Sequence, residues 1–266
     1  MVQLAPELVA GRYRPLRPLG EGGAGDVCAA LDELAGGEVA LKRVRLGAPG
    51  VRAALRADVR APRGLALACG ALAREILALK AANGWDRLDL HCLPADLHLY
   101  PDRIPDAVEA AVHQHRAAYD RIIVVYADCG TGGLLQARCA ALGVEMVPGP
   151  HCYAFFAGND TFAAWTETEI TAFYLTDFLA RHFDAFVWRP MGFDRHPELI
   201  GMMLNGYEKL VYLAQTDDPE LDRMARQAAA RLGLSYERRA TGYGDLAPVL
   251  AAAAAGKAVA ARPAAP

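Results

Sequence analysis

Residues 120–133 read DRIIVVYADCGTGG, and this stretch decides the fold. An apolar run from Ile122 to Tyr126, mostly of β-branched residues, is typical of a strand buried on both faces. Three glycines and a threonine then form a turn before a helical pattern over residues 134–142. Strand, glycine-rich turn and helix make the repeating unit of a parallel sheet, whose ligands bind beyond the carboxyl ends of the strands.

The same alternation extends in both directions from this stretch. Helical patterns separate short apolar runs, and a capping-box pattern, Thr166 with Glu169, predicts a helix through Phe178. This order predicts an α/β fold for residues 64–250, a three-layer sandwich with a mainly parallel, Rossmann-like sheet. The expected strands cover residues 65–69, 88–93, 122–126, 144–147, 209–214 and 235–239.

Composition restricts the class of protein. The chain has 266 residues, of which 53% are hydrophobic, and a net charge of −3, so it can bury a full core but offers no broad basic surface for nucleic acid. Because no apolar run reaches about 18 residues and no signal peptide is visible, we expect no membrane partner and a cytoplasmic location. The six cysteines contain no Cys-x-x-Cys pair, and we expect them to be reduced.

The first 46 residues differ from the rest. Residues 20–27 read GEGGAGDV and residues 39–42 read VALK, so this piece is similar to the start of a bacterial serine/threonine protein kinase. The resemblance implies a small N-terminal β-hairpin piece in which Gly20, Gly22 and Gly25 cover ATP phosphates and Lys42 holds them. No His-Arg-Asp, Asp-Phe-Gly or Ala-Pro-Glu motif follows downstream, so we expect no kinase activity.

Two further segments complete the expected domain organisation. Residues 47–63 are basic and rich in proline and glycine, which indicates a linker after the kinase-like fragment of residues 1–46. Residues 251–266 are rich in alanine and proline, and we expect a disordered tail there.

Three cysteines fall just past predicted strand ends. Cys69, Cys129 and Cys152 would meet at one edge of a parallel sheet, where imidazoles of His98, His151 or His196 could complete a set of metal ligands. Thiolates suit zinc or an iron–sulphur cluster. The residues therefore predict a metal or cluster site, although a small residue at such a turn is often there only because it fits. Of the other cysteines, Cys28 and Cys139 are expected to be inert, and Cys92 is expected to lie in the core.

The central turn admits two other interpretations. Gly130, Thr131, Gly132 and Gly133 could hold an anion at a helix N-terminus without any metal. Alternatively, the turn could present Cys129 as a nucleophile of lowered pKa. Asp128 and Asp194 are candidate acid–base groups for such a reaction, although loop aspartates often cap turns instead.

Six stretches carry a resemblance to a known family, at residues 68–76, 93–98, 126–133, 151–153, 175–179 and 194–199. On these stretches, residues from about 64 to 250 resemble domain-of-unknown-function family 1638. The family carries no assigned activity, and the resemblance implies a link to corrinoid-dependent methyl transfer in one-carbon metabolism.

Two functions are consistent with these residues. The first is a cytosolic metal- or cluster-binding protein whose partner is a small molecule or a corrinoid methyl-transfer protein. The second is a metal-free, anion-binding accessory protein that uses the glycine-rich turn, and an inactive, ATP-binding kinase-like protein is a distant third. Whether the protein is an enzyme stays open at this point.

Overall fold

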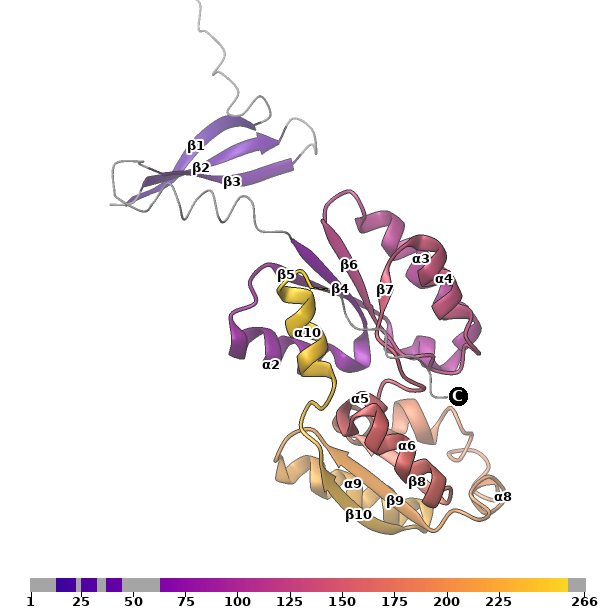
Figure 1. Ribbon diagram of the computed structural model, residues 1–266. Coiled ribbons are helices and arrows are strands. Elements are labelled where there is room, and N and C mark those ends of the chain that lie inside the picture. Colours follow the sequence, from indigo (N-terminus) through magenta and orange to yellow (C-terminus); the bar gives the residue numbers. More distant parts are fainter. Residues whose placement is uncertain (1–12, 23–24, 33–36, 45–62, 258–266) are drawn as a thin grey trace, which may run out of the picture. The chain divides into compact units, whose positions relative to one another are not determined.

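The computed structural model describes residues 13–22, 25–32, 37–44 and 63–257, and Figure 1 shows its course. The chain divides into two compact units, Met1–Ala61 and Pro62–Pro266, and each is described by itself. The predicted linker at 47–62 and the end of the predicted tail at 258–266 lie outside the described residues.

The N-terminal unit contains one small antiparallel sheet. Gly20 and Gly22 lie on its first strand, Gly25 begins the second, and Lys42 lies on the third, where it pairs with Val27. The predicted small antiparallel piece is therefore confirmed. Its strands follow one another in the order β1 (Tyr13–Gly22), β2 (Gly25–Asp32) and β3 (Gly37–Val44).

The second unit begins with a parallel sheet of four strands in the order β5-β4-β6-β7. Its two central strands are buried along almost their whole length, as expected for apolar, β-branched runs covered on both faces. The strands are β4 (Gly64–Cys69), β5 (Leu88–Leu93), β6 (Arg121–Val125) and β7 (Glu145–Met146).

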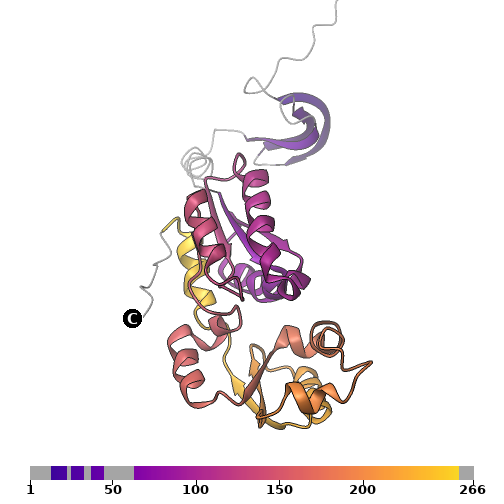
Figure 2. The same ribbon diagram turned by 90° about the vertical axis from the view of Figure 1, so that its right-hand side faces the viewer.

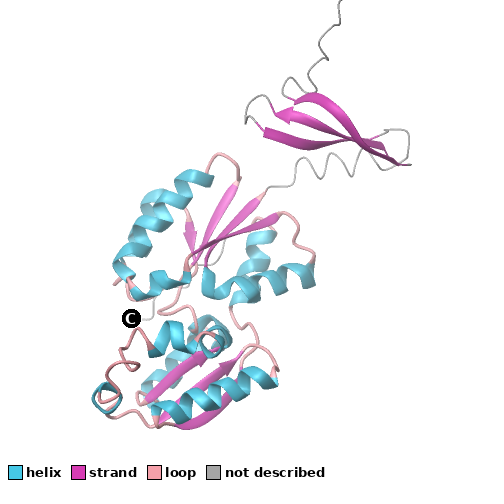
Figure 3. Ribbon diagram, turned by 180° about the vertical axis from the view of Figure 1, so that it is seen from behind, coloured by secondary structure: helices cyan, strands magenta, loops and turns pink. Residues whose placement is uncertain are grey.

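Helices cover both faces of this sheet (Figures 1 and 3). One face carries α3 (Ile104–His115) and α4 (Leu134–Leu142), and the other carries α2 (Ala73–Asn83) and α10 (Leu246–Ala254). Both α2 and α4 end at a glycine in the left-handed conformation, Gly84 and Gly143, as their sequences predict. We call this part, residues 64–157 and 246–257, the first lobe.

Residues 158–245 form a second lobe around a parallel sheet of three strands in the order β10-β9-β8, which is separate from the first sheet in Figure 2. Asp218 caps α9 by accepting hydrogen bonds from the amides of Glu220 and Leu221. The main elements of this lobe are α6 (Asn159–Thr168), β8 (Ala172–Thr176), α7 (Asp177–Arg181), β9 (Lys209–Ala214), α9 (Pro219–Leu232) and β10 (Ser235–Ala240).

Short helical elements fill the connections. Several of them lie at the carboxyl ends of strands, where they position side chains of the site described below. They are η1 (Gly70–Leu72), η2 (Ala95–Leu99), η3 (Pro101–Arg103), α5 (Ala154–Ala157), the π-helical turn η4 (Asp184–Trp188) and α8 (Leu199–Met203).

The structure confirms the α/β class with parallel sheets and corrects three details. The strands after residue 63 form two sheets rather than one. The helix predicted from Thr166 through Phe178 is wrong, because α6 ends at Thr168 and the apolar residues after it form β8, which pairs with β9. The tail predicted from residue 251 is helical to Ala254, since Ala253 is buried against the first lobe.

Among the described residues, no helix has both the length and the apolar character needed to cross a membrane.

Candidate metal centre

Four connections at the carboxyl edge of the first sheet carry the candidate ligands. Cys69 is the last residue of β4, and His98 lies in η2 just after β5. Cys129 follows β6, and Cys152 follows β7. Because all four strands run in parallel, residues that are up to 83 positions apart (69 to 152) in the chain reach the same edge.

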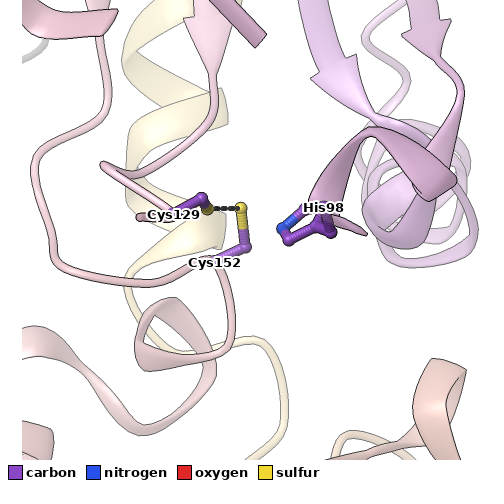
Figure 4. Close-up of side chains that lie close together, drawn as sticks. All are labelled: His98, Cys129 and Cys152. Atoms are coloured by element: carbon purple, nitrogen blue, oxygen red, sulfur yellow. Dashed lines mark hydrogen bonds between the residues drawn. The ribbon is translucent and has the colours of Figure 1, made fainter. Parts of the chain in front are cut away.

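The side chains converge closely. The sulfurs of Cys129 and Cys152 lie 3.0 Å apart, and the Sγ atom of Cys69 lies 3.4 Å from Nδ1 of His98. One ligand atom from each of His98, Cys129 and Cys152 lies within 4.8 Å of the other two. Figure 4 shows the imidazole pointing toward the sulfur of Cys152. All three thiols are buried, so the cluster is shielded from water.

A glycine brings Cys69 and His98 together. A Cβ atom at Gly70 would lie 2.9 Å from the carbonyl oxygen of Leu93 and 3.3 Å from the amide nitrogen of Ala95. Only a residue without a side chain allows the end of β4 to approach the β5–η2 turn this closely. The Cys69 sulfur also accepts a hydrogen bond from the amide of Ala71, which fixes its position at the start of η1.

Backbone pairing beyond the strands brings Cys129 and Cys152 together. The amides of Asp128 and Cys129 donate to the carbonyl oxygens of Gly149 and Pro150, both at 2.9 Å. Cys129 has a φ of 49°, a left-handed conformation that a non-glycine residue rarely adopts. Such strain persists only where surrounding contacts impose it, and it is common at functional sites.

Contacts among Cys69, His98, Cys129 and Cys152 determine the pKa values of these four side chains. The hydrogen bond with Cys152, followed by contacts with His98, lowers the pKa of Cys69 and of Cys129 to about 5 despite their burial. Burial by itself lowers the pKa of His98, but the hydrogen bonds with Cys129 and Cys69 raise it to about 10. The hydrogen bonds with Cys129 and Cys69, together with burial, raise the pKa of Cys152. The edge therefore favours the thiolate, the form that binds metals, at Cys69 and Cys129, and the neutral thiol at Cys152.

Tyr126 completes the environment of the thiols. Its ring is fully buried and stacks on the His98 ring at 6.3 Å, and its hydroxyl group has no hydrogen-bond partner in the structure. Burial and the neighbouring Cys69 and Cys152 raise the pKa of this hydroxyl. A buried polar group without a partner calls for an explanation. A neutral phenol beside the Cys69 sulfur can donate a hydrogen bond to it.

The glycine-rich turn does not present its amides to a ligand. The carboxylate of Asp128 accepts hydrogen bonds from the amides of Gly132 (3.1 Å) and Gly133 (2.7 Å) and from the hydroxyl of Thr131 (2.7 Å). Although burial raises the pKa of Asp128, these hydrogen bonds lower it overall. In the structure the chain's own carboxylate therefore occupies these groups, and the binding of an external anion by this turn stays a prediction. Gly130 supplies a left-handed turn residue, with a φ of 85°.

The hydrogen bonds of the Asp128 carboxylate to Thr131, Gly132 and Gly133 indicate that it stabilises the turn, whereas the sequence predicted an acid–base role. Asp194 lies in the second lobe beside Arg195, at 3.9 Å, and the structure does not bring it to the thiols. His196 is exposed and hydrogen-bonds Glu198. These two residues were predicted as site residues from sequence position alone, without knowledge that the chain forms two sheets.

The remaining predicted ligand and the remaining cysteines also lie outside the group. His151 stacks on Tyr153 at 4.9 Å, so His98 rather than His151 is the imidazole of the group. Burial raises the pKa of Cys139 to about 11, and burial and Cys69 raise that of Cys92. The raised pKa of Cys139 agrees with the expectation that this thiol is inert, and Cys92, expected in the core, is half-buried and packs against the core.

Two residues of interest were missed from the sequence. Tyr126 ends the apolar run two residues before Asp128, and its position as a polar residue at the end of a buried strand was the available signal. Glu75 follows Leu72 by three residues on a helix, so its spacing places a carboxylate on the buried face.

Fold and site together define an α/β protein with parallel sheets and a buried cysteine–histidine group that can hold a metal ion. The chain belongs to the family described as "Protein of unknown function (DUF1638)", which matches residues 92–250. Neither a curated protein nor a solved structure matches the chain. The resemblance of residues 11–46 to a kinase is not confirmed by any comparison and stays a prediction.

Proposed function

We propose that this protein binds a single zinc ion between His98, Cys129 and Cys152, with Cys69 as the fourth donor. The observation that carries this proposal is the convergence of three buried thiols and one imidazole from four separate strand ends. A set of three thiolates and one imidazole is typical of tetrahedral zinc sites.

The spacing of the ligand atoms favours one ion over a cluster. Two sulfurs bound to the same zinc ion at about 2.3 Å are at most about 4.6 Å apart. The sulfurs of Cys129 and Cys152 lie 3.0 Å apart, within this limit. An iron–sulphur cluster distributes its four ligands over two or four irons, which requires a wider spread of the whole set.

Metal analysis of the full chain, purified without oxygen, tests the proposal. We expect about one zinc per chain in the wild type and a loss of most of it in Cys129→Ser and Cys152→Ser. X-ray absorption at the zinc edge should show sulfur at about 2.3 Å and nitrogen at about 2.0–2.1 Å. Cys69→Ser should lower the sulfur contribution, which identifies the fourth donor.

Cys92→Ser is the matched control, because Cys92 is a half-buried thiol on β5 outside the group. It should retain its zinc, and circular dichroism should show that every variant is folded. Absence of zinc and iron from the wild type, or unchanged zinc in both Cys129→Ser and Cys152→Ser, would end the proposal. Detection of iron and sulphide together with a visible absorption band would show that the site holds an iron–sulphur cluster instead of zinc.

The expected link to a corrinoid methyl-transfer protein has no support from the geometry and stays a prediction. The same is true of a nucleophilic role for Cys129. The zinc site as proposed uses all four donors, which is the arrangement of structural zinc sites rather than of catalytic sites with an open position.

A further inference from the structure

A cleft of about 310 Å³ lies away from the glycine-rich turn, within the second unit. The first turn of α2, which follows Cys69 and η1, supplies Arg74 and Glu75 to its lining. The opposite side comes from the carboxyl ends of β8 and β9, with Arg181 on the helix after β8. The carboxyl ends of parallel strands are where α/β proteins bind ligands, and the volume suits a small molecule.

Glu75 is the first sign that this cleft accepts a ligand. Its side chain is only 5% exposed, and its Oε2 atom has no hydrogen-bond partner in the structure. Burial raises the pKa of this carboxyl group, and the charge of Asp177 acts in the same direction. A buried carboxylate oxygen without a donor is costly, and the cost disappears when a bound molecule supplies the donor.

Two guanidinium groups are the second sign. Arg74 and Arg181 both line the cleft, and within the described part of the chain neither forms an ion pair. Elsewhere in the two lobes, arginines such as Arg239 and Arg138 do pair with carboxylates. Free guanidinium groups that line one cleft are suited to a carboxylate, which they bind through paired N–H donors.

The other acidic groups of the cleft are already engaged. Asp177 accepts hydrogen bonds from the hydroxyl of Tyr212, the amide of Gln215 and both the amide and hydroxyl of Thr216. Asp217 pairs with Arg238 at 2.9 Å, and Asp218 caps α9. The polar groups left for a ligand are therefore Arg74, Arg181, the Oε2 atom of Glu75 and the hydroxyl of Tyr243.

We propose that this cleft binds a small carboxylic acid that carries an amino or hydroxyl group. Arg74 and Arg181 take its carboxylate, and Glu75 accepts a hydrogen bond from its amino or hydroxyl group. A phosphate ion fits less well than a carboxylate. It can bind the two arginines, but its higher negative charge is repelled by Glu75 and Asp177. This proposal does not depend on zinc binding.

Calorimetric titration and thermal unfolding of the full chain test the proposal with five probes. They are L-alanine, L-lactate, propionate (no donor group), ethylamine (no carboxylate) and inorganic phosphate. We expect alanine or lactate to bind and to raise the melting temperature, and propionate to bind about tenfold more weakly, since it leaves Glu75 unpaired. Ethylamine and phosphate should show no saturable binding.

Three variants assign the roles. Arg181→Gln should weaken binding about tenfold or more. Glu75→Gln should raise the melting temperature of the ligand-free protein, because it removes a buried carboxylate. The same variant should bind alanine or lactate no more tightly than propionate. Arg189→Gln, an exposed arginine outside the cleft, is the matched control and should bind as the wild type does.

Three results would overturn the proposal. The first is an absence of binding by both alanine and lactate, and the second is binding by phosphate alone. The third is a variant without the expected effect: Arg181→Gln that binds alanine or lactate with unchanged affinity, or Glu75→Gln that still prefers alanine or lactate to propionate. Because a structural role for Glu75 would lower rather than raise the melting temperature of Glu75→Gln, the stability measurement separates the two roles.

Discussion

At the scale of single residues, the cysteines differ by their surroundings rather than by their chemistry. Cys129 and Cys152 approach each other to 3.0 Å, whereas Cys139 lies in α4 among apolar side chains. Burial alone raises a thiol pKa, as at Cys139, while hydrogen bonds from neighbouring thiols and His98 overcome burial at Cys129. Reactivity at this edge is therefore a property of the group.

The first prediction follows from that proximity. In metal-free protein, the oxidant diamide should link Cys129 to Cys152, because a thiolate lies next to a second sulfur and only a small movement is needed to reach the bond length of about 2.0 Å. Peptide mapping by mass spectrometry identifies the link. Added zinc should slow the reaction, and Cys92→Ser should not change it. A link between Cys69 and either of these cysteines would show that a different pair is closest.

The second prediction concerns Asp128. Asp128→Asn should lower the free energy of unfolding by about 0.5–2 kcal/mol, since the charged acceptor of two amides and one hydroxyl is lost. The folded-state pKa of Asp128 is lowered, so its contribution is fully present above the unfolded-state pKa of about 3.9 and is lost as the pH falls through the folded value.

Denaturant unfolding of both proteins between about pH 7 and pH 2 measures this contribution. The difference in stability should persist at neutral pH and close in the acidic range. Asp102→Asn, on the exposed side of η3, is a control in which no comparable difference is expected. A difference that stays constant down to the lowest pH would contradict the role assigned to the Asp128 carboxylate.

At the scale of elements, the site depends on how closely two connections approach. Gly70 lies between the end of β4 and the β5–η2 turn, and the atoms that a Cβ would meet there belong to the backbone. Backbone atoms of neighbouring strands cannot move aside cheaply. The distance between Cys69 and His98 is therefore determined by a residue that carries no chemistry of its own.

The third prediction tests this arrangement. Gly70→Ala should lower the free energy of unfolding by about 1–3 kcal/mol and reduce zinc content, because the β5–η2 turn and His98 are pushed away from Cys69. Gly201→Ala is the matched control, since a Cβ there meets nothing within 4 Å. That variant should be neutral or slightly more stable. Equal behaviour of the two variants in thermal unfolding and metal analysis would contradict the prediction.

At the scale of the whole molecule, the candidate ligands and the cleft all belong to one compact unit. The unit Pro62–Pro266 contains both lobes and their buried cores, and the N-terminal unit ends at Ala61. The four candidate ligands and every residue that lines the cleft lie after residue 62. A unit with its own core is expected to fold independently.

The fourth prediction is that the fragment 62–266 keeps the properties of the second unit. Its melting temperature should lie within about 2–4 °C of that of the full chain, and its zinc content should be the same. Differential scanning calorimetry and metal analysis measure these quantities. A fragment that is unfolded, or that loses zinc while staying folded, would show that the N-terminal residues contribute to the site.

Much of the fold could be predicted because its signals are local. The run Ile122 to Tyr126 and the helical pattern over residues 134–142 correspond to β6 and to α4. The failures are also informative. Thr166 and Glu169 match a capping box, but strand pairing with β9 outweighs that local preference in residues 172–176. Local patterns do not show which strands pair, so the division into two sheets was not predicted.

By itself, the sequence determined the α/β class and placed Cys69, Cys129 and Cys152 at strand ends, because strand periodicity and glycine turns act between near neighbours. Only the tertiary structure decided which imidazole joins them, that the Asp128 carboxylate binds the amides of its own turn, and that Arg74 and Glu75 line one cleft with Arg181. These choices depend on contacts between segments far apart in the chain. The energies of such contacts arise only when the sheets pack, and for this reason no local pattern encodes them.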